Sequence, residues 1–155
     1  MTTDLRPIFE RLAGEFLQAH PAIPHQWART PDSSTLVVPP RSPTGFEVFA
    51  TVCAASITVG ISPGGFHDDY EYLAPQIPPE DFALSAFEGL TQFLRDDVRV
   101  REFRANNRPY AWQLELLGKD GWIRGESHSK FLASWFGKKT DHVLANDWLS
   151  AQTAA

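Results

Sequence analysis

The sequence predicts an α+β fold in which an antiparallel sheet of five to six strands carries two main helices on one face. Three observations support this class. Apolar residues recur at helical spacing near the N-terminus and again over 79–97, and they alternate with polar residues in several short segments. Runs of strands are separated by single helices, an order typical of α+β proteins. Short C-terminal helices are expected over 131–136 and 141–149.

The first helix is expected over 4–19, because Leu5, Phe9 and further apolar residues recur on one side. Asp4 is placed to accept hydrogen bonds from the first free backbone amides. Residues 20–44 then hold a large share of the twelve prolines, which interrupt regular backbone hydrogen bonding. This composition predicts a proline-rich irregular arm at 20–44.

Two adjacent strands are expected at 45–53 and 56–62, where apolar and small or polar residues alternate. Only Ala54-Ala55 separates them, so one long bent strand is the alternative. The sequence Ser62-Pro63-Gly64-Gly65 predicts a turn after the second segment.

The helix over 79–97 has the clearest pattern, a stripe of apolar residues at i, i+3, i+4 and i+7. Pro79 suits the first helical position, and Glu80 and Asp81 complement the positive end of the helix dipole. A meander of strands is expected after it. Its turns are expected at Asn106-Asn107 and Gly118–Gly121, and its strands at 98–103, 110–117 and 122–126.

Length and composition fit one globular domain. The chain has 155 residues, of which 43% are hydrophobic, 12% aromatic and 21% charged. These proportions provide material for a buried core and exclude an intrinsically disordered chain. We therefore expect a single domain over 1–155, with the irregular arm at 20–44.

The acidic residues are concentrated in the middle third of the sequence. No lysine or arginine occurs between Arg41 and Arg95, although the net charge of the whole chain is only −5. The acids of this interval are Glu47, Asp68, Asp69, Glu71, Glu80, Asp81 and Glu88. Such a charge distribution favours a basic partner or a cation.

Part of this acidic cluster falls in a run that also contains aromatic residues. The run consists of Phe66, His67, Asp68, Asp69, Tyr70, Glu71 and Tyr72. We predict that its aromatic rings and carboxylates are exposed together and form a surface that binds a protein partner.

A metal site is the alternative interpretation of the same run. In an extended chain His67, Asp69 and Glu71 share one face, and an imidazole with two carboxylates is a plausible set of ligands for a divalent metal. Side chains two residues apart in a strand lie about 7 Å apart, so a solvated or partner-facing strand is the simpler interpretation. We therefore expect no cofactor.

Other catalytic patterns are missing from the sequence. No Gly-x-Ser-x-Gly elbow, His-Glu-x-x-His motif or Walker lysine occurs, and Ser127-His128-Ser129 is better explained as a loop or a helix cap. Cys53 lies in an apolar run, which is typical of an inert buried thiol. The sequence therefore favours a protein that is not an enzyme, and no catalytic residue is assigned.

The only basic stripe contains Arg99, Arg101 and Arg104, with Arg95 and Arg108 nearby. Acidic residues interleave with these arginines, so we expect the arginines to pair with carboxylates and not with nucleic acid. No apolar stretch approaches the length of a membrane span, and no signal peptide is recognisable at the N-terminus. With its single cysteine, the chain is expected to be cytoplasmic.

In size, acidic charge and element order the chain resembles bacterial immunity proteins, small α+β antidotes that neutralise basic toxins such as nucleases. No motif carries the resemblance, and it assigns a role to no residue. It implies a non-enzymatic cytosolic protein that holds a basic protein partner, and the segment Phe66–Tyr72 is the predicted binding surface. The sequence does not predict the oligomeric state.

Overall fold

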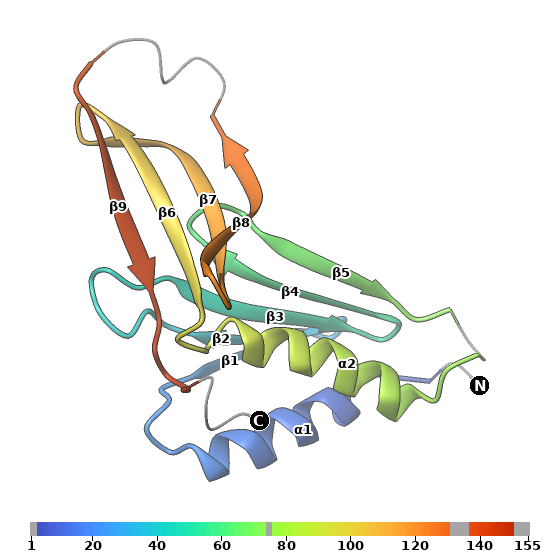
Figure 1. Ribbon diagram of the computed structural model, residues 1–155. Coiled ribbons are helices and arrows are strands. Elements are labelled where there is room, and N and C mark those ends of the chain that lie inside the picture. Colours follow the sequence, from blue (N-terminus) through green and yellow to red (C-terminus); the bar gives the residue numbers. More distant parts are fainter. Residues whose placement is uncertain (1–2, 74–75, 131–136, 151–155) are drawn as a thin grey trace. The chain divides into compact units, whose positions relative to one another are not determined.

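The computed structural model describes residues 3–73, 76–130 and 137–150 (Figure 1). Within them it contains two helices and nine strands, which confirms the α+β class. The elements are α1 (Arg6–Ala19), β1 (Gln26–Arg29), β2 (Ser33–Val38), β3 (Glu47–Cys53), β4 (Ser56–Ser62), β5 (His67–Glu71), α2 (Pro79–Gln92), β6 (Val98–Ala105), β7 (Arg108–Gly118), β8 (Gly121–Ser129) and β9 (Lys139–Ala145).

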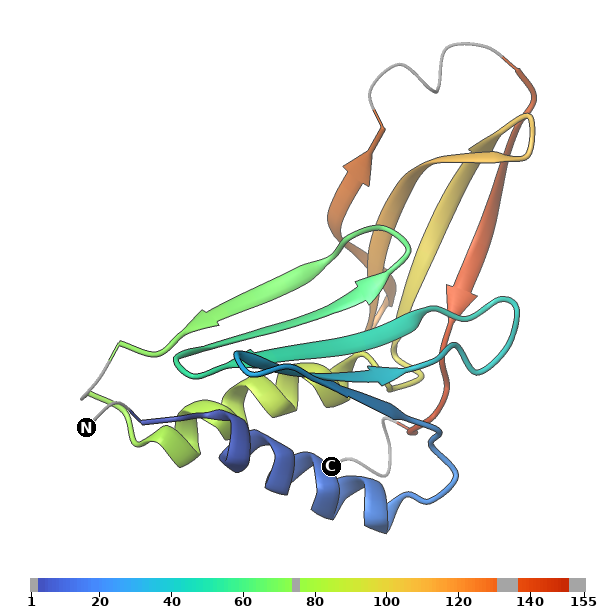
Figure 2. The same ribbon diagram turned by 180° about the vertical axis from the view of Figure 1, so that it is seen from behind.

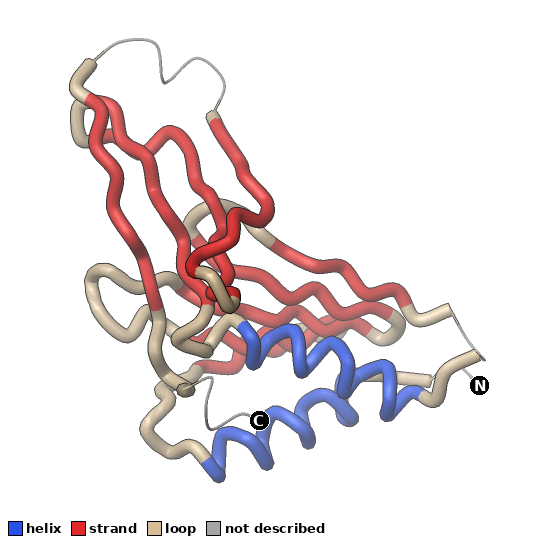
Figure 3. The backbone as a smooth tube through the Cα atoms, in the orientation of Figure 1, coloured by secondary structure: helices blue, strands red, loops and turns tan. Residues whose placement is uncertain are grey.

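The strands form two antiparallel sheets (Figure 3), so the expectation of one sheet with five to six strands is wrong. Five strands are ordered β1-β2-β3-β4-β5, and four are ordered β8-β7-β6-β9. The physical reason is strand pairing: β6 is flanked by β7 and β9 on its two sides and adds to no strand of the first sheet.

The described chain divides into two compact units, each built around one sheet, and the prediction of one domain over 1–155 stays a prediction. The first unit comprises Met1–Pro39, Glu47–Gly60 and His67–Phe93. The second unit comprises Pro40–Phe46, Ile61–Phe66 and Leu94–Ala155.

The core of the first unit lies between its sheet and its two helices. In β2, β3 and β4 every second residue is buried, which produces one apolar face. Figures 1 and 2 show α1 and α2 running along one side of this sheet, and both helices contact β3. Phe87 of α2 packs edge-to-face against Phe9 and Phe16 of α1, with ring centroids 5.8 and 5.4 Å apart.

The second main helix begins at Pro79, as the sequence predicts, and the first begins at Arg6, two residues later than expected. Pro lies in the first turn of each, and Glu80 and Asp81 occupy the first turn of α2. The carboxylate of Asp4 accepts a hydrogen bond from the backbone N–H of Arg6 at 3.0 Å. The second helix ends at Gln92 rather than at residue 97, because Arg95 forms a β-bridge with Leu149.

Ten of the 25 residues of the predicted irregular arm lie in regular strands. Within 20–44, β1 and β2 form an antiparallel hairpin at the edge of the sheet, in which Trp27 pairs with Leu36. The expectation of an irregular segment is therefore wrong for these two strands. They fit between the prolines, and Leu36 and Val38 are buried on the core side of the sheet.

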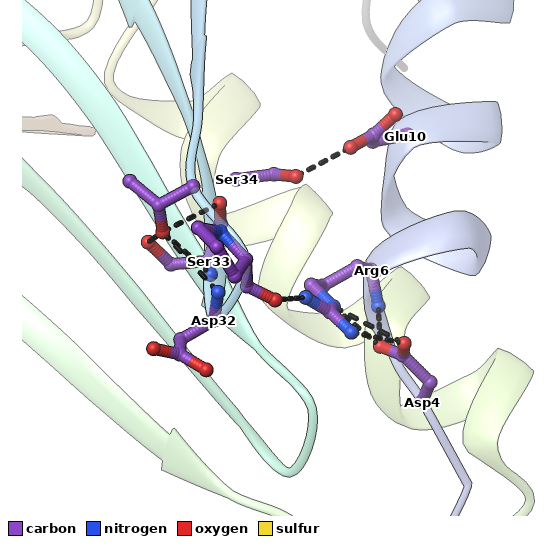
Figure 4. A network of polar contacts seen from close by, with 8 residues as sticks. Asp4, Arg6, Glu10, Asp32, Ser33 and Ser34 are labelled. Atoms are coloured by element: carbon purple, nitrogen blue, oxygen red, sulfur yellow. Dashed lines mark hydrogen bonds and ion pairs between the residues drawn. The ribbon is translucent and has the colours of Figure 1, made fainter.

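A polar network ties α1 to this hairpin (Figure 4). Ser34 donates a hydrogen bond from its Oγ to Oε1 of Glu10 at 2.5 Å, and Arg29 pairs with the same carboxylate at 3.2 Å. Arg6 donates to Asp4 and to the backbone carbonyl of Pro31 at 2.5 Å. The Ser34 hydroxyl, more than the nearby Arg29 charge, holds the pKa of Glu10 below its usual value.

The lowered pKa of Glu10 gives the stability of the protein a defined pH dependence. The carboxylate contributes at neutral pH, and its contribution is lost as the pH falls through the folded-state pKa, because protonation removes the charge that the network binds. Glu10→Gln is expected to lower the free energy of unfolding by about 1 kcal/mol at pH 7 and to have a shrinking effect towards pH 3. Urea unfolding across this pH range measures both.

The control for this prediction is Glu15→Gln on the same helix. Glu15 is exposed and makes only a surface ion pair with Arg11 at 3.3 Å, so its loss is expected to cost no more than about 0.5 kcal/mol. An effect of Glu10→Gln no larger than that of the control would contradict the role assigned to the Ser34 hydrogen bond.

The second unit contains the meander that the sequence predicts. Strands β6, β7 and β8 follow one another antiparallel, and Asn106 and Asn107 turn the chain between β6 and β7 with φ of 51° and 64°. Asparagine tolerates this left-handed conformation, which matches the twist of a tight hairpin. Val98 and Val100 are buried, as the alternation over 98–103 predicts.

The expected C-terminal helix over 141–149 is wrong. Residues 139–145 form β9, which pairs with β6 so that Leu144 lies opposite Val100. Leu144 is buried beside it, and pairing with β6 therefore prevails over a helical pattern too short to be stable alone. The other short helix, expected over 131–136, lies outside the described residues.

Asn146 fastens the segment 40–46 to the end of β9 within the second unit. Its side chain is fully buried, accepts a hydrogen bond from the Phe46 N–H at 3.2 Å and donates one to the Phe46 carbonyl at 2.5 Å. The backbone of Gly45 comes so close that a Cβ there would lie 2.6 Å from Oδ1 of Asn146. The buried side-chain amide of Asn146 thus satisfies both backbone polar groups of Phe46.

Candidate functional site

The predicted binding segment forms the edge of the first sheet. Among the described residues, strand β5 pairs antiparallel with β4 alone, and Figures 1 and 3 show it at one edge of the sheet. Asp69 lies opposite Thr58, and Tyr70 lies opposite Ile57. The extended conformation expected for this segment is therefore present.

One face of β5 carries the three residues considered as metal ligands. His67, Asp69 and Glu71 are exposed on the face that includes Thr58, which donates a hydrogen bond to Oδ1 of Asp69 at 2.6 Å. Nε2 of His67 lies 3.5 Å from Oδ2 of Asp69. Among the described residues, no three His, Cys, Asp or Glu side chains are grouped to hold one metal ion, so this geometry gives the metal hypothesis no support.

The aromatic residues of β5 and its C-terminal end pack towards α2. Tyr70 and Tyr72 contact the ring of Phe82 edge-to-face, with centroids 6.4 and 5.2 Å away. A Cβ at Gly89 would lie 2.7 Å from the Tyr70 hydroxyl, so glycine is needed where the tyrosine crosses the helix. Burial, with a smaller contribution from the charge of Asp68, raises the pKa of Tyr70.

The two tyrosines are thus half-buried supports rather than freely exposed rings. Tyr72 is fixed further by a hydrogen bond from its hydroxyl to the carbonyl of Ile77 at 3.0 Å. Both keep part of their surface accessible. They give the strand a rigid position on α2, and rigid aromatic side chains lose little entropy when a partner binds.

Phe66 does not belong to the exposed surface, and its prediction as an exposed aromatic residue is wrong. Only 1% of its surface is accessible, and its ring packs edge-to-face on His128 with centroids 4.8 Å apart. Both residues belong to the second unit. Phe66 is therefore a core residue immediately before β5.

Two exposed apolar side chains beside the strand were missed by sequence reasoning. Leu73 lies two residues after the end of β5 and is 79% exposed, and Ile77 is 51% exposed. Their signal in the sequence is an apolar residue placed immediately after the acidic run, where no helical or strand pattern buries it. We define the β5 surface as His67, Asp68, Asp69, Tyr70, Glu71, Tyr72, Leu73 and Ile77.

Among the described residues, the only basic side chain that pairs with a carboxylate of the β5 surface is His67, which lies 3.5 Å from Asp69. The three lysine or arginine residues of the first unit are Arg6, Arg11 and Arg29. Each pairs with a carboxylate elsewhere, on Asp4, on Glu15 and Glu80, or on Glu10. In the described part of the chain no lysine or arginine forms an ion pair with Asp68, Asp69 or Glu71.

The arginine stripe of the second unit pairs with acids, as the sequence predicts. Arg99 and Arg101 both bind the buried carboxylate of Glu115, at 2.6 and 2.9 Å, and the Arg99 guanidinium lies 3.9 Å from the ring centre of Trp122. Burial acts to raise the pKa of Glu115, but the hydrogen bonds and charges of Arg101 and Arg99 together hold it below its usual value. Arg104 pairs with the buried Glu102 in the same way, at 2.6 Å.

Comparison of the chain with models of protein families, with curated proteins and with solved structures found no match. In the described residues, neither helix has the length and apolar character needed to cross a membrane.

Proposed function

We propose that the protein is a non-enzymatic binding protein that holds a basic protein partner on the β5 surface. The observation that carries this proposal is the exposure of Asp68, Asp69 and Glu71 along a sheet edge, where no lysine or arginine of the described residues pairs with them. A toxin-neutralising immunity role is the specific form of the proposal, in keeping with the acidic net charge of −5.

The physical basis is the combination of charge and apolar area. Exposed carboxylates attract a basic protein over a distance and raise its association rate. Tyr72, Leu73 and Ile77 provide apolar contact area beside them, because each keeps accessible surface. Apolar contact at the centre with charge around it is the usual organisation of a specific protein interface.

The test is co-purification from the source organism with charge-reversed variants. The β5 variant carries Asp68→Lys, Asp69→Lys and Glu71→Lys, and it is expected to fold normally and to lose the partner because like charges now face each other. The captured proteins are quantified by mass spectrometry, and folding is checked by circular dichroism and thermal unfolding.

A matched control separates the site from the overall charge. The control variant carries Asp32→Lys, Glu88→Lys and Asp120→Lys, which change three exposed acids that make no side-chain ion pair with a described residue. Both triple variants bring the net charge from −5 to +1. The control variant is expected to retain the partner. Equal capture by the wild-type protein and the β5 variant would refute the proposal.

A second explanation of the acidic strand is protection against aggregation, since charged residues on an edge strand prevent pairing between copies. It is tested by neutralising the same residues as Asp68→Asn, Asp69→Asn and Glu71→Gln. The binding proposal expects this variant to stay monomeric by light scattering. Self-association of this variant, together with a wild-type protein that captures nothing, would favour protection of the edge.

A further inference from the structure

The hydrogen bonds between β4 and β5 fix which way the backbone groups of β5 point. The N–H of Ile61 donates to the carbonyl of Phe66 at 2.9 Å, and the N–H of Tyr72 donates to the carbonyl of Ala55 at 2.8 Å. Along a strand of an antiparallel pair, residues whose N–H and carbonyl groups point towards the neighbouring strand alternate with residues whose groups point away from it. The backbone N–H and carbonyl groups that point towards β4 are therefore those of Phe66, Asp68, Tyr70 and Tyr72.

It follows that the N–H and carbonyl groups of Asp69 and Glu71 point away from β4. In the described residues β5 is the last strand of its sheet, so no further strand receives them there. These two residues are also the ones whose carboxylates lie exposed on the Thr58 side of the sheet. Asp69 and Glu71 thus combine outward-pointing backbone N–H and carbonyl groups with exposed carboxylates.

We infer that the basic partner binds as an extended segment that adds a strand to β5. This inference rests on the proposed function and specifies how the same surface is used. The partner segment hydrogen-bonds to the backbone of Asp69 and Glu71 and carries lysine or arginine at every second position. Main-chain bonds give such strand additions their affinity, and alternate side chains give them specificity.

The spacing of the two carboxylates supports this mode of binding. Residues of an added strand that bond to Asp69 and Glu71 have their own side chains on the same face, with Cβ atoms about 5 Å from those of their partners. Two basic residues separated by one position therefore meet both acids at once. Leu73, which lies two residues after β5 and is 79% exposed, can then contact an apolar residue that follows the basic positions of the partner segment.

The test uses synthetic peptides as probes with the full-length protein. The first is a blocked seven-residue peptide in which lysine alternates with threonine, and the second is the same peptide with N-methyl groups on its lysine amides. Methylation keeps every charge but removes the N–H groups that would bond to Asp69 and Glu71. We expect the unmethylated peptide to bind at least about tenfold more tightly, since two main-chain bonds are lost on methylation.

Hydrogen exchange locates the binding. The unmethylated peptide is expected to slow exchange of the Asp69 and Glu71 amides, measured by NMR, and to leave the Asp120 amide of the β7–β8 turn unchanged. A pair of variants adds an independent readout: Glu71→Gln removes the charge, and Glu71→Pro removes the outward N–H as well. Proline is tolerated where an edge strand faces away from its neighbour, so Glu71→Pro is expected to fold and to bind more weakly than Glu71→Gln.

The outcomes separate this inference from the proposed function. Equal affinity for the two peptides, or no binding of either, would overturn strand addition, and the peptide comparison decides this even where Glu71→Pro fails to fold. Loss of the natural partner in the β5 variant would then still support a binding role through side chains alone. Retention of that partner in the β5 variant would overturn both.

Discussion

Phe66→Ala is expected to lower the free energy of unfolding by about 3–5 kcal/mol, the usual range for removing a buried phenylalanine ring. The reason is its burial: 1% of its surface is accessible, and its ring contacts that of His128. The alanine would leave a cavity that this contact cannot fill. Urea unfolding at neutral pH measures the effect.

Leu73→Ala is the matched control, because Leu73 lies two residues after β5, whereas Phe66 immediately precedes β5, and Leu73 is 79% exposed. Its replacement is expected to change stability by no more than about 0.5 kcal/mol. The two variants then distinguish the roles of the two residues: buried Phe66 stabilises the fold, and exposed Leu73 is available to a partner. A stable Phe66→Ala protein that loses its partner would restore Phe66 to the binding surface and contradict this division.

Asn146→Ala is expected to cost about 3 kcal/mol or more. The asparagine side chain is the hydrogen-bond partner of both the N–H and the carbonyl of Phe46. The alanine leaves these two buried groups unsatisfied, and each such group costs about 1–3 kcal/mol. Urea unfolding gives the total loss, and faster hydrogen exchange at the Phe46 amide is expected to locate it.

The neighbouring Asp147→Asn variant is the control for this site. Asp147 is exposed and pairs with Arg41 at 3.1 Å, a surface ion pair whose loss is expected to cost less than about 1 kcal/mol. Asn146→Asp keeps the acceptor for the Phe46 N–H but places a carboxylate against the Phe46 carbonyl, so it is expected to be as damaging as alanine. A small effect of both Asn146 variants would show that the segment 40–46 is held by other contacts.

The elements predicted most accurately from sequence are those whose pattern is local. The apolar stripe over 79–97 gave α2, because helical burial repeats within a few residues along the chain. The alternation over 45–62 gave β3 and β4 on either side of Ala54-Ala55. The asparagine pair at 106–107 gave a turn, because the required positive φ is a property of the residues themselves.

The errors concern structure that depends on distant partners. Strand β9 was expected to be helical, because its pairing with β6 depends on residues about 40 positions away. The prolines around β1 and β2 favoured an irregular segment in the sequence prediction, although the two strands themselves contain no proline. The division into two sheets could not be predicted, because local patterns show that a segment is a strand and not which strand it joins.

The candidate site was predicted in part for the same reason. Alternation correctly placed Asp69 and Glu71 on one face of an extended strand. It also grouped Phe66 with this surface, whereas its burial depends on His128, far along the sequence. The outward direction of the Asp69 and Glu71 backbone follows from the pairing register of β4 and β5, which no local sequence pattern contains.

The central claim, that the β5 surface holds a basic partner by charge and shape, is tested most directly by dissociation constants. The partner obtained by co-purification is titrated with the wild-type protein, the β5 variant and the control variant at low and physiological salt. The account predicts at least about 100-fold weaker binding for the β5 variant, a change within about threefold for the control variant, and weaker wild-type binding as salt screens the carboxylates. Equal affinities of the two triple variants would contradict it.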